Sequence, residues 1–167
     1  MLTRWLAALL LAASGATVPA LTQARGGSVT VRLLAINDLH GVVDPPTGNN
    51  GRLGSTPVGG LAYLATHLKQ LERDVAHSIV VSAGDNIGAS PLLSALFHDE
   101  PTIEALNTLG LSLSAVGNHE LDEGWPELLR LQRGGCHPHD GCQDGTPFAG
   151  ASFHFLAANV HRVPATA

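Results

Sequence analysis

Two kinds of apolar pattern alternate along this chain. Short runs of β-branched and aliphatic residues are typical of strands, and they predict four strands, at residues 29–37, 78–84, 111–117 and 152–160. Stretches in which apolar residues recur every three or four positions are typical of helices. They predict helices at residues 59–76, 90–97, 100–109 and 124–132. This alternation predicts an α/β fold with mainly parallel strands and flanking helices.

Several positions predict where the helices begin, end and face the core. In the first helix the apolar residues lie at helical spacing, at Leu61, Leu64, Ala65, Leu68 and Leu71. Ser90 is a candidate N-cap with Pro91 at the first helical position, and Gly110 is expected to end the third helix. Pro126 lies near the first turn of the last helix. Residues 44–58 are rich in Pro, Gly, Asn and Ser, so we expect a surface loop there.

The first 24 residues resemble a secretory signal peptide. Arg4 precedes an apolar stretch that is too short to span a bilayer, and Thr22 and Ala24 are small residues before a possible cut at Arg25. A membrane anchor is the alternative, but Gly15 and Pro19 interrupt the apolar run. No second candidate span follows, so we expect residues 25–167 to be exported, to the periplasm or outside the cell, with no stable membrane span.

The charge of the chain argues against nucleic acid as its main partner. The formal net charge is −5, and it becomes −6 when Arg4 leaves with the signal peptide. Binding to a nucleic-acid backbone depends on Lys and Arg side chains that neutralise phosphates. A small anionic substrate remains compatible with this charge, because bound metal ions can supply positive charge.

The two cysteines, Cys136 and Cys142, lie six positions apart in the stretch GGCHPHDGCQDG. In an exported protein a disulfide that closes this short loop is the leading interpretation. Two free thiols are one alternative. A zinc site that also uses His137 and His139 is another, although the spacing matches no common zinc pattern.

Polar residues follow three of the predicted strands, in the stretches 37–40, 84–86 and 117–120. Taken singly, each stretch is weak evidence for a functional site, since an Asp after a strand is usually a helix cap or turn former. The carboxyl ends of parallel strands meet at one edge of a sheet, where ligands bind. Asp38 and His40 would share one face of an extended segment. Together with Asp85 and Asn118 they offer carboxylate, imidazole and amide donors, which suit Zn²⁺, Mn²⁺ or Fe²⁺.

These motifs resemble the calcineurin-like metallophosphoesterases, and more narrowly the bacterial 5′-nucleotidase and UDP-sugar hydrolase family. The resemblance rests on D-x-H, G-D and G-N-H-E in order, within NDLHG, GDNIGASPLLSALF and GNHELDEGW, and it runs from about residue 29 to 160.

The resemblance implies a role for each of these residues. Asp38 and His40 would bind one metal ion, Asp85 would bridge two ions, and Asn118 would bind the second. His119 and Asp122 would form the catalytic pair, in which His119 contacts the phosphoryl group and Asp122 orients its imidazole. Glu120 is expected to support the site rather than bind metal. The implied reaction is hydrolysis of a small phosphate ester such as a nucleotide, by a water that a two-metal site activates.

The chain also departs from that family. The family's later Gly-His and Gly-His-x-His motifs are absent from the sequence, and so is its C-terminal nucleotide-binding domain. We therefore expect residues 25–167 to be the N-terminal portion of a metallophosphoesterase α/β sandwich, with one metal ion or none in this chain alone. Three interpretations compete: an incomplete phosphoesterase, a non-catalytic truncated remnant, and an exported module that binds nucleotide or metal. The oligomeric state is not predicted.

Overall fold

The computed structural model describes residues 27–161 and residue 163. The predicted signal peptide, residues 1–24, lies outside this described part. Within the described part, none of the helices combines the length and the apolar character that crossing a membrane requires.

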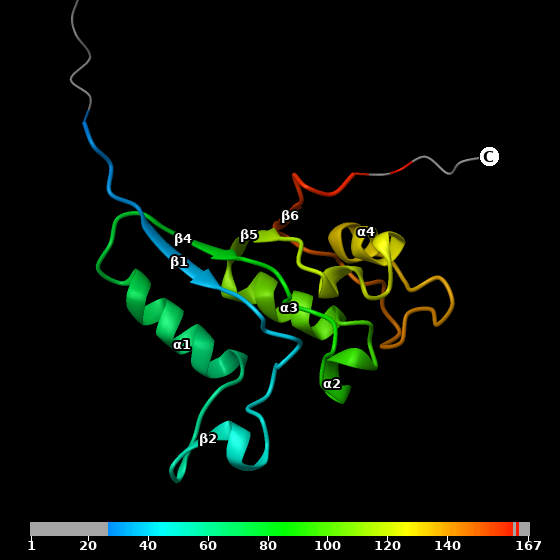
Figure 1. Cartoon of the computed structure of the whole chain (residues 1–167), viewed down its shortest axis with the longest axis horizontal. Coiled ribbons are helices and arrows are strands. Elements are labelled where there is room, and N and C mark those ends of the chain that lie inside the picture. The colour runs from blue at the N-terminus through cyan, green and yellow to red at the C-terminus, as the bar shows by residue number, and fades with distance from the viewer. Residues whose placement is uncertain (1–26, 162, 164–167) are drawn as a thin grey trace, which may run out of the picture.

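A parallel sheet organises the fold (Figure 1). Its strands are β1 (Arg32–Ile36), β4 (Ser78–Ser82), β5 (Leu111–Ala115) and β6 (His154–Leu156). They pair in the order β1-β4-β5-β6, and each pair is parallel. All four strands are shorter than predicted: β4 and β5 end two residues early, β1 begins three residues late and ends one residue early, and β6 is shorter at both ends. The prediction of an α/β fold with mainly parallel strands is confirmed.

Each predicted helix is present. The helices are α1 (Leu61–Glu72), α2 (Leu92–Ala95), α3 (Glu100–Leu109) and α4 (Trp125–Arg133), with short 3-10 turns η1 (Gly48–Gly51) and η2 (His119–Leu121). Gly110 ends α3 in a left-handed conformation, as expected. The cap of α2 was predicted one residue early, because Pro91 rather than Ser90 holds the N-cap position and α2 begins at Leu92.

The prediction that residues 44–58 form a surface loop is confirmed for its exposure, but the loop also contains regular structure that was not predicted. This stretch contains η1 and an antiparallel hairpin of β2 (Arg52–Leu53) and β3 (Thr56–Pro57). The four strand residues are exposed, so the hairpin has no buried face and leaves no apolar pattern in the sequence. The hairpin forms because a tight turn joins the two strands, and this turn contains Gly54 at φ +63°.

The core lies on one face of the sheet. Leu34 and Val80 point to this face and pack with side chains from three helices, which include Leu68, Ile103, Leu106 and Leu131. Each strand is added on the same side of the one before it, and right-handed crossovers then place every connecting helix on the same face. Each buried leucine contributes about 1.5–3 kcal/mol.

The opposite face of the sheet is left partly uncovered by the described residues. Leu33 is 64% exposed although its neighbour Leu34 is buried, and Leu156 is 53% exposed. On the helix side, Leu71 was expected to face the core but is 47% exposed, because it lies near the end of α1. The sheet therefore has one covered face and one apolar face that is open.

Candidate functional site

Three loops lie side by side at the carboxyl edge of the sheet, one after each of β1, β4 and β5. Backbone hydrogen bonds join the first two: the amide of Asp38 donates to the carbonyl of Gly84 at 3.1 Å, and that of His40 to the carbonyl of Asp85 at 3.1 Å. The parallel pairing thus continues beyond the strands. It brings together polar residues that are more than 40 positions apart in the sequence.

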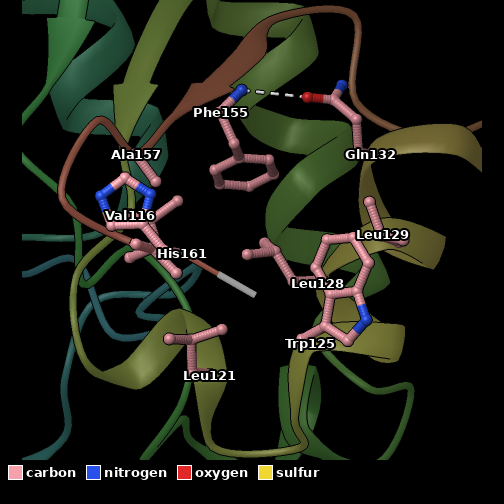
Figure 2. A pocket seen from close by; sticks show the side chains of 10 residues that line it. Val116, Leu121, Trp125, Leu128, Leu129, Gln132, Phe155, Ala157 and His161 are labelled. Atoms are coloured by element: carbon pink, nitrogen blue, oxygen red, sulfur yellow. Dashed lines mark hydrogen bonds between the residues drawn. The ribbon is translucent and has the colours of Figure 1, made fainter. Parts of the chain in front are cut away.

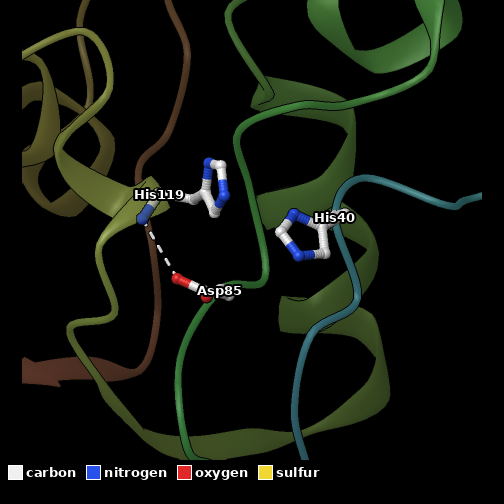
Figure 3. A group of neighbouring side chains, drawn as sticks. All are labelled: His40, Asp85 and His119. Carbon is white, nitrogen blue, oxygen red and sulfur yellow. Dashed lines mark hydrogen bonds between the residues drawn. The ribbon is translucent and has the colours of Figure 1, made fainter.

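His40, Asp85 and His119 form the polar cluster of this edge (Figure 3). Each offers one ligand atom, and these atoms all lie within 4.8 Å of one another. The two imidazole rings meet edge to face, with centroids 4.8 Å apart. The backbone amide of His119 donates to Asp85 Oδ1 at 3.0 Å. Two imidazoles and a carboxylate at this spacing fit a divalent ion such as Zn²⁺, Mn²⁺ or Fe²⁺.

Hydrogen bonds orient both imidazoles. His40 Nδ1 lies 3.0 Å from the carbonyl oxygen of Gly88. Because a carbonyl can only accept, Nδ1 carries the proton and Nε2 keeps its lone pair for a ligand. His119 Nδ1 is held in the same way by Asp122 Oδ2 at 2.7 Å. The hydrogen bond with the Asp122 carboxylate raises the pKa of His119 above its ordinary value.

The prediction that Asp38 and His40 lie in an extended segment is wrong. Asp38, His40 and Asp85 all have left-handed conformations, with φ of 51°, 46° and 54°. Such conformations cost about 1–2 kcal/mol for residues other than glycine. Asp38 and His40 approach each other through this turn, with Asp38 Oδ1 4.0 Å from His40 Nε2. Backbone strain at three neighbouring polar residues is typical of functional sites.

The buried carboxylate of Glu120 links two of these loops through hydrogen bonds. Its side chain is 3% exposed. One carboxylate oxygen, Oε2, accepts from the amides of Asp85 at 2.8 Å and Gly117 at 2.7 Å. The other, Oε1, accepts from the amide of Asn86 at 2.9 Å and from its side chain at 3.3 Å. The expectation that Glu120 supports the site fits this geometry, but the sequence did not show that it bridges two loops.

Glycines allow the loops to approach closely. A Cβ built on Gly117 would lie 2.1 Å from Asp85 Oδ1. A Cβ on Gly88, whose φ is +77°, would lie 2.7 Å from Asp122 Oδ2 and 2.9 Å from the Cβ of His119. Any side chain at either position would therefore displace a residue of the cluster.

The predicted site residues differ in how closely they gather. His119, expected to contact the phosphoryl group, lies within the cluster of possible ligands together with His40 and Asp85. Asp38 lies beside His40, and its side chain is 59% exposed. Asn118 is exposed and precedes η2. The assignment of Asp38, His40, Asp85 and Asn118 as metal ligands stays a prediction.

A cavity lies away from this polar cluster, on another part of the molecule (Figure 2). It measures about 530 Å³ and lies between η2, α4 and the region of β6, where Trp125, Leu128 and Phe155 line it. The amide of Phe155 donates to Gln132 Oε1 at 3.0 Å at its rim. Its lining is almost entirely apolar, so it lacks the charged groups that a phosphoryl transfer needs.

A disulfide joins Cys136 and Cys142, as the sequence predicted. Inside the loop that it closes, the backbones of His137 and Gly141 pair through two hydrogen bonds of 3.1 and 2.9 Å. The alternatives of two free thiols and of a thiolate zinc site are therefore wrong.

Comparisons with known proteins agree with the motifs. A family model described as calcineurin-like phosphoesterase matches residues 31–159. An uncharacterized protein of Acinetobacter calcoaceticus from the pqq-V 5′ region is 45% identical, over 82% of this chain and 72% of its own length. Endonuclease YhcR of Bacillus subtilis is 39% identical over 78% of this chain. A snake venom 5′-nucleotidase of Gloydius brevicauda is 32% identical over 62% of this chain.

These relatives differ in the share of their length that the chain spans. It is 11% for the Bacillus endonuclease and 18% for the venom nucleotidase. Among solved structures, the NAD nucleotidase of Haemophilus influenzae superposes with a TM-score of 0.51 and 24% identity, over 65% of this chain and 21% of that protein. This last likeness supports the fold.

Proposed function

The chain belongs to the calcineurin-like phosphoesterase family, and we propose that it serves as an exported, metal-dependent phosphoesterase of the 5′-nucleotidase type. Its substrates would be nucleotides or related small phosphate esters. One observation carries the proposal: polar atoms of His40, Asp85 and His119, from three separate loops, lie within 4.8 Å of one another at the carboxyl edge of the sheet. Two of the proposed metal ligands, His40 and Asp85, therefore lie beside the proposed phosphoryl contact, His119.

The residues that would hold the metal are Asp38, His40, Asp85 and Asn118. His40 is oriented for this role, because its Nδ1–H donates a hydrogen bond to the carbonyl of Gly88 and Nε2 is left free. A divalent ion bound here would lower the pKa of a water that attacks phosphorus and would offset the charge of the phosphoryl group. Zn²⁺, Mn²⁺ and Fe²⁺ all suit the donor set.

His119 would contact the reacting phosphoryl group. Asp122 holds Nδ1 at 2.7 Å, which fixes the ring and leaves Nε2 as the free nitrogen. A proton on Nε2 can then be donated to a phosphoryl oxygen as negative charge develops on it. Asp122 acts through His119 and is a positioning residue.

Two features support the cellular location that we propose. The disulfide between Cys136 and Cys142 is stable in oxidising compartments and rare in the cytosol. Residues 1–24 have the sequence pattern of a secretory signal. We propose export to the periplasm or the medium on these grounds.

The open face of the sheet supports a further part of the proposal. Leu33 and Leu156 are more than half exposed on it, and exposed apolar patches in soluble proteins usually mark contact surfaces. We propose that residues 25–167 act as the N-terminal portion of an α/β sandwich whose second layer covers this face. The relatives named above, most of them several times longer, are compatible with this arrangement.

The experiment is a joint measurement of metal uptake and phosphate release. The purified full chain, stripped of metal, is supplied with Mn²⁺ or Zn²⁺ and assayed on AMP, UDP-glucose and a single-stranded oligonucleotide. We expect metal uptake that Asp85→Asn lowers, and phosphate release from the small esters that His119→Gln lowers by about 10²–10⁴-fold. His139→Ala, an exposed histidine outside the cluster, is the matched control.

The possible outcomes separate the competing functions. Metal uptake without turnover, together with saturable nucleotide binding, would support a binding module instead. Cleavage of the oligonucleotide in preference to AMP would overturn the substrate class. Failure of the folded chain both to take up metal and to release phosphate would overturn the proposal that this chain is itself a phosphoesterase.

A further inference from the structure

A second cluster of histidine and carboxylate side chains lies outside the site described above. His98 lies in the turn between α2 and α3, Glu123 lies between η2 and α4, and His137 lies in the disulfide-closed loop. Each offers one ligand atom, and these atoms all lie within 4.8 Å of one another. The side chains of His98 and His137 are 17% and 12% exposed, so both imidazoles are largely shielded from water.

The two imidazoles are held face to face, with ring centroids 3.8 Å apart and an interplanar angle of 15°. His98 is bracketed by carboxylates: Nδ1 lies 2.8 Å from Glu123 Oε2, and Nε2 lies 2.9 Å from Asp140 Oδ2. A carboxylate on one nitrogen of a metal-binding histidine fixes the ring and increases the basicity of the other nitrogen. Asp140, beside Nε2 of His98, is therefore placed to orient this imidazole and to leave Nδ1 for a metal ion.

The nearby backbone favours a functional interpretation. His98 and Asp99 have φ of 49° and 61°, two consecutive left-handed residues that are not glycine. This conformation is costly for both. The strained turn directs His98 toward Glu123 and His137. Backbone strain that is kept at such a turn is typical of functional sites.

We propose that His98, Glu123 and His137 form a second divalent metal site, with Asp140 orienting the ring of His98. Two imidazoles and one carboxylate are a common protein ligand set for Zn²⁺, with the fourth position left to water. The ligands come from three segments that are separated in the sequence, so a bound ion would connect them. The argument for this site does not rest on the proposed phosphoesterase function.

Its position gives the ion a structural consequence. Glu123 directly follows Asp122, which holds His119. A small cavity of about 20 Å³ lies between the two clusters, and His98, Glu123, His119 and Asp122 all line it. An ion held by Glu123 would restrict the turn that carries Asp122 and would anchor the disulfide-closed loop to the domain.

The structure revises the zinc site considered from the sequence. That site used both cysteines with His137 and His139. The cysteines are joined to each other, His98 from another part of the chain meets His137 instead, and His139 lies 5.9 Å from His137, ring to ring. His139 is exposed and is not one of the proposed ligands.

The test is the zinc stoichiometry of the full chain, purified without an affinity tag. Metal-free protein is dialysed against Zn²⁺ and its bound metal is measured by atomic emission, for the wild type and for His98→Ala, His137→Ala, Asp85→Asn and His139→Ala. We expect His98→Ala and His137→Ala each to lose one equivalent of zinc. His139→Ala, on the same loop, should lose none. Asp85→Asn should keep the equivalent that His137→Ala loses.

Thermal unfolding gives a second measurement on the same proteins. Zn²⁺ should raise the Tm of Asp85→Asn and His139→Ala, and this rise should be missing in the double variant Asp85→Asn/His137→Ala. Asp140→Asn should bind zinc about 10–100-fold more weakly, because it removes the orienting carboxylate. Circular dichroism of the metal-free variants shows that each is folded before zinc is added.

Two results would overturn the second site. One is an unchanged zinc stoichiometry in folded His98→Ala and His137→Ala. The other is an equal loss of zinc in His139→Ala, which would indicate unspecific binding by surface histidines. Loss of metal in Asp85→Asn alone would leave the first site in place and refute the second, so the two proposals fail separately.

Discussion

Glu120 offers the sharpest test of how the loops of the first site are held together. In Glu120→Gln one carboxylate oxygen becomes an NH₂ group, which donates and cannot accept. If the NH₂ group replaces Oε2, it faces the amides of Asp85 and Gly117. If it replaces Oε1, it faces the two N–H donors of Asn86. In either orientation two buried donors lose their acceptor.

The expected destabilisation follows from these contacts. Hydrogen bonds to a charged group contribute about 1.5–3 kcal/mol each, so the loss of two costs about 3–6 kcal/mol. Domains of this size are stable by about 5–15 kcal/mol. Glu120→Gln should therefore remove a large part of the free energy of unfolding. It should also weaken metal binding, because either Asp85 itself or Asn86, the next residue in the chain, loses a contact that fixes the backbone of this loop.

Urea unfolding followed by circular dichroism measures this change. The matched control is Glu104→Gln, the same substitution at an exposed position of α3, which should change the free energy of unfolding by less than about 0.5 kcal/mol. A loss of less than about 1 kcal/mol in Glu120→Gln would refute the reasoning. It would mean that the loops keep their positions without the carboxylate.

Three further predictions concern the close contacts, the core and the disulfide. Gly117→Ala should lower metal uptake at least tenfold with little loss of helix content, since its Cβ would lie 2.1 Å from Asp85 Oδ1; uptake equal to the wild type in equilibrium dialysis would contradict this. Leu106→Ala should lower the free energy of unfolding by about 2–5 kcal/mol, and Leu33→Ala by less than about 1 kcal/mol, because the side chains are 0% and 64% exposed; similar losses in urea unfolding would show that both faces of the sheet are covered. Reduction of the Cys136–Cys142 bond should cost about 2 kcal/mol by the loop-entropy relation, measured as a lower Tm in dithiothreitol, and an unchanged Tm would indicate that the loop is held by its other contacts.

Much of the fold follows from the apolar pattern. Short apolar runs predict the four sheet strands, apolar residues at a spacing of three to four predict the four helices, and the alternation of the two predicts parallel pairing. The hairpin at residues 52–57 could not be predicted in this way, because its strands bury no face. The exposure of Leu33 beside buried Leu34 also depends on what covers each face of the sheet. A local pattern does not contain that information.

The residue types that follow each strand can be read from the sequence, and with them the chemistry that gathers at one edge of the sheet. Their detailed positions depend on contacts across the sheet. The tertiary structure alone brings His119 to His40 and Asp85, and it alone places Glu120 beneath two loops. The same is true of His98, which lies 39 residues before His137 in the sequence but stacks against it in space. Periodicity reports the local conformation of the chain, whereas a site made of separate loops exists only after the sheet has aligned the strand ends.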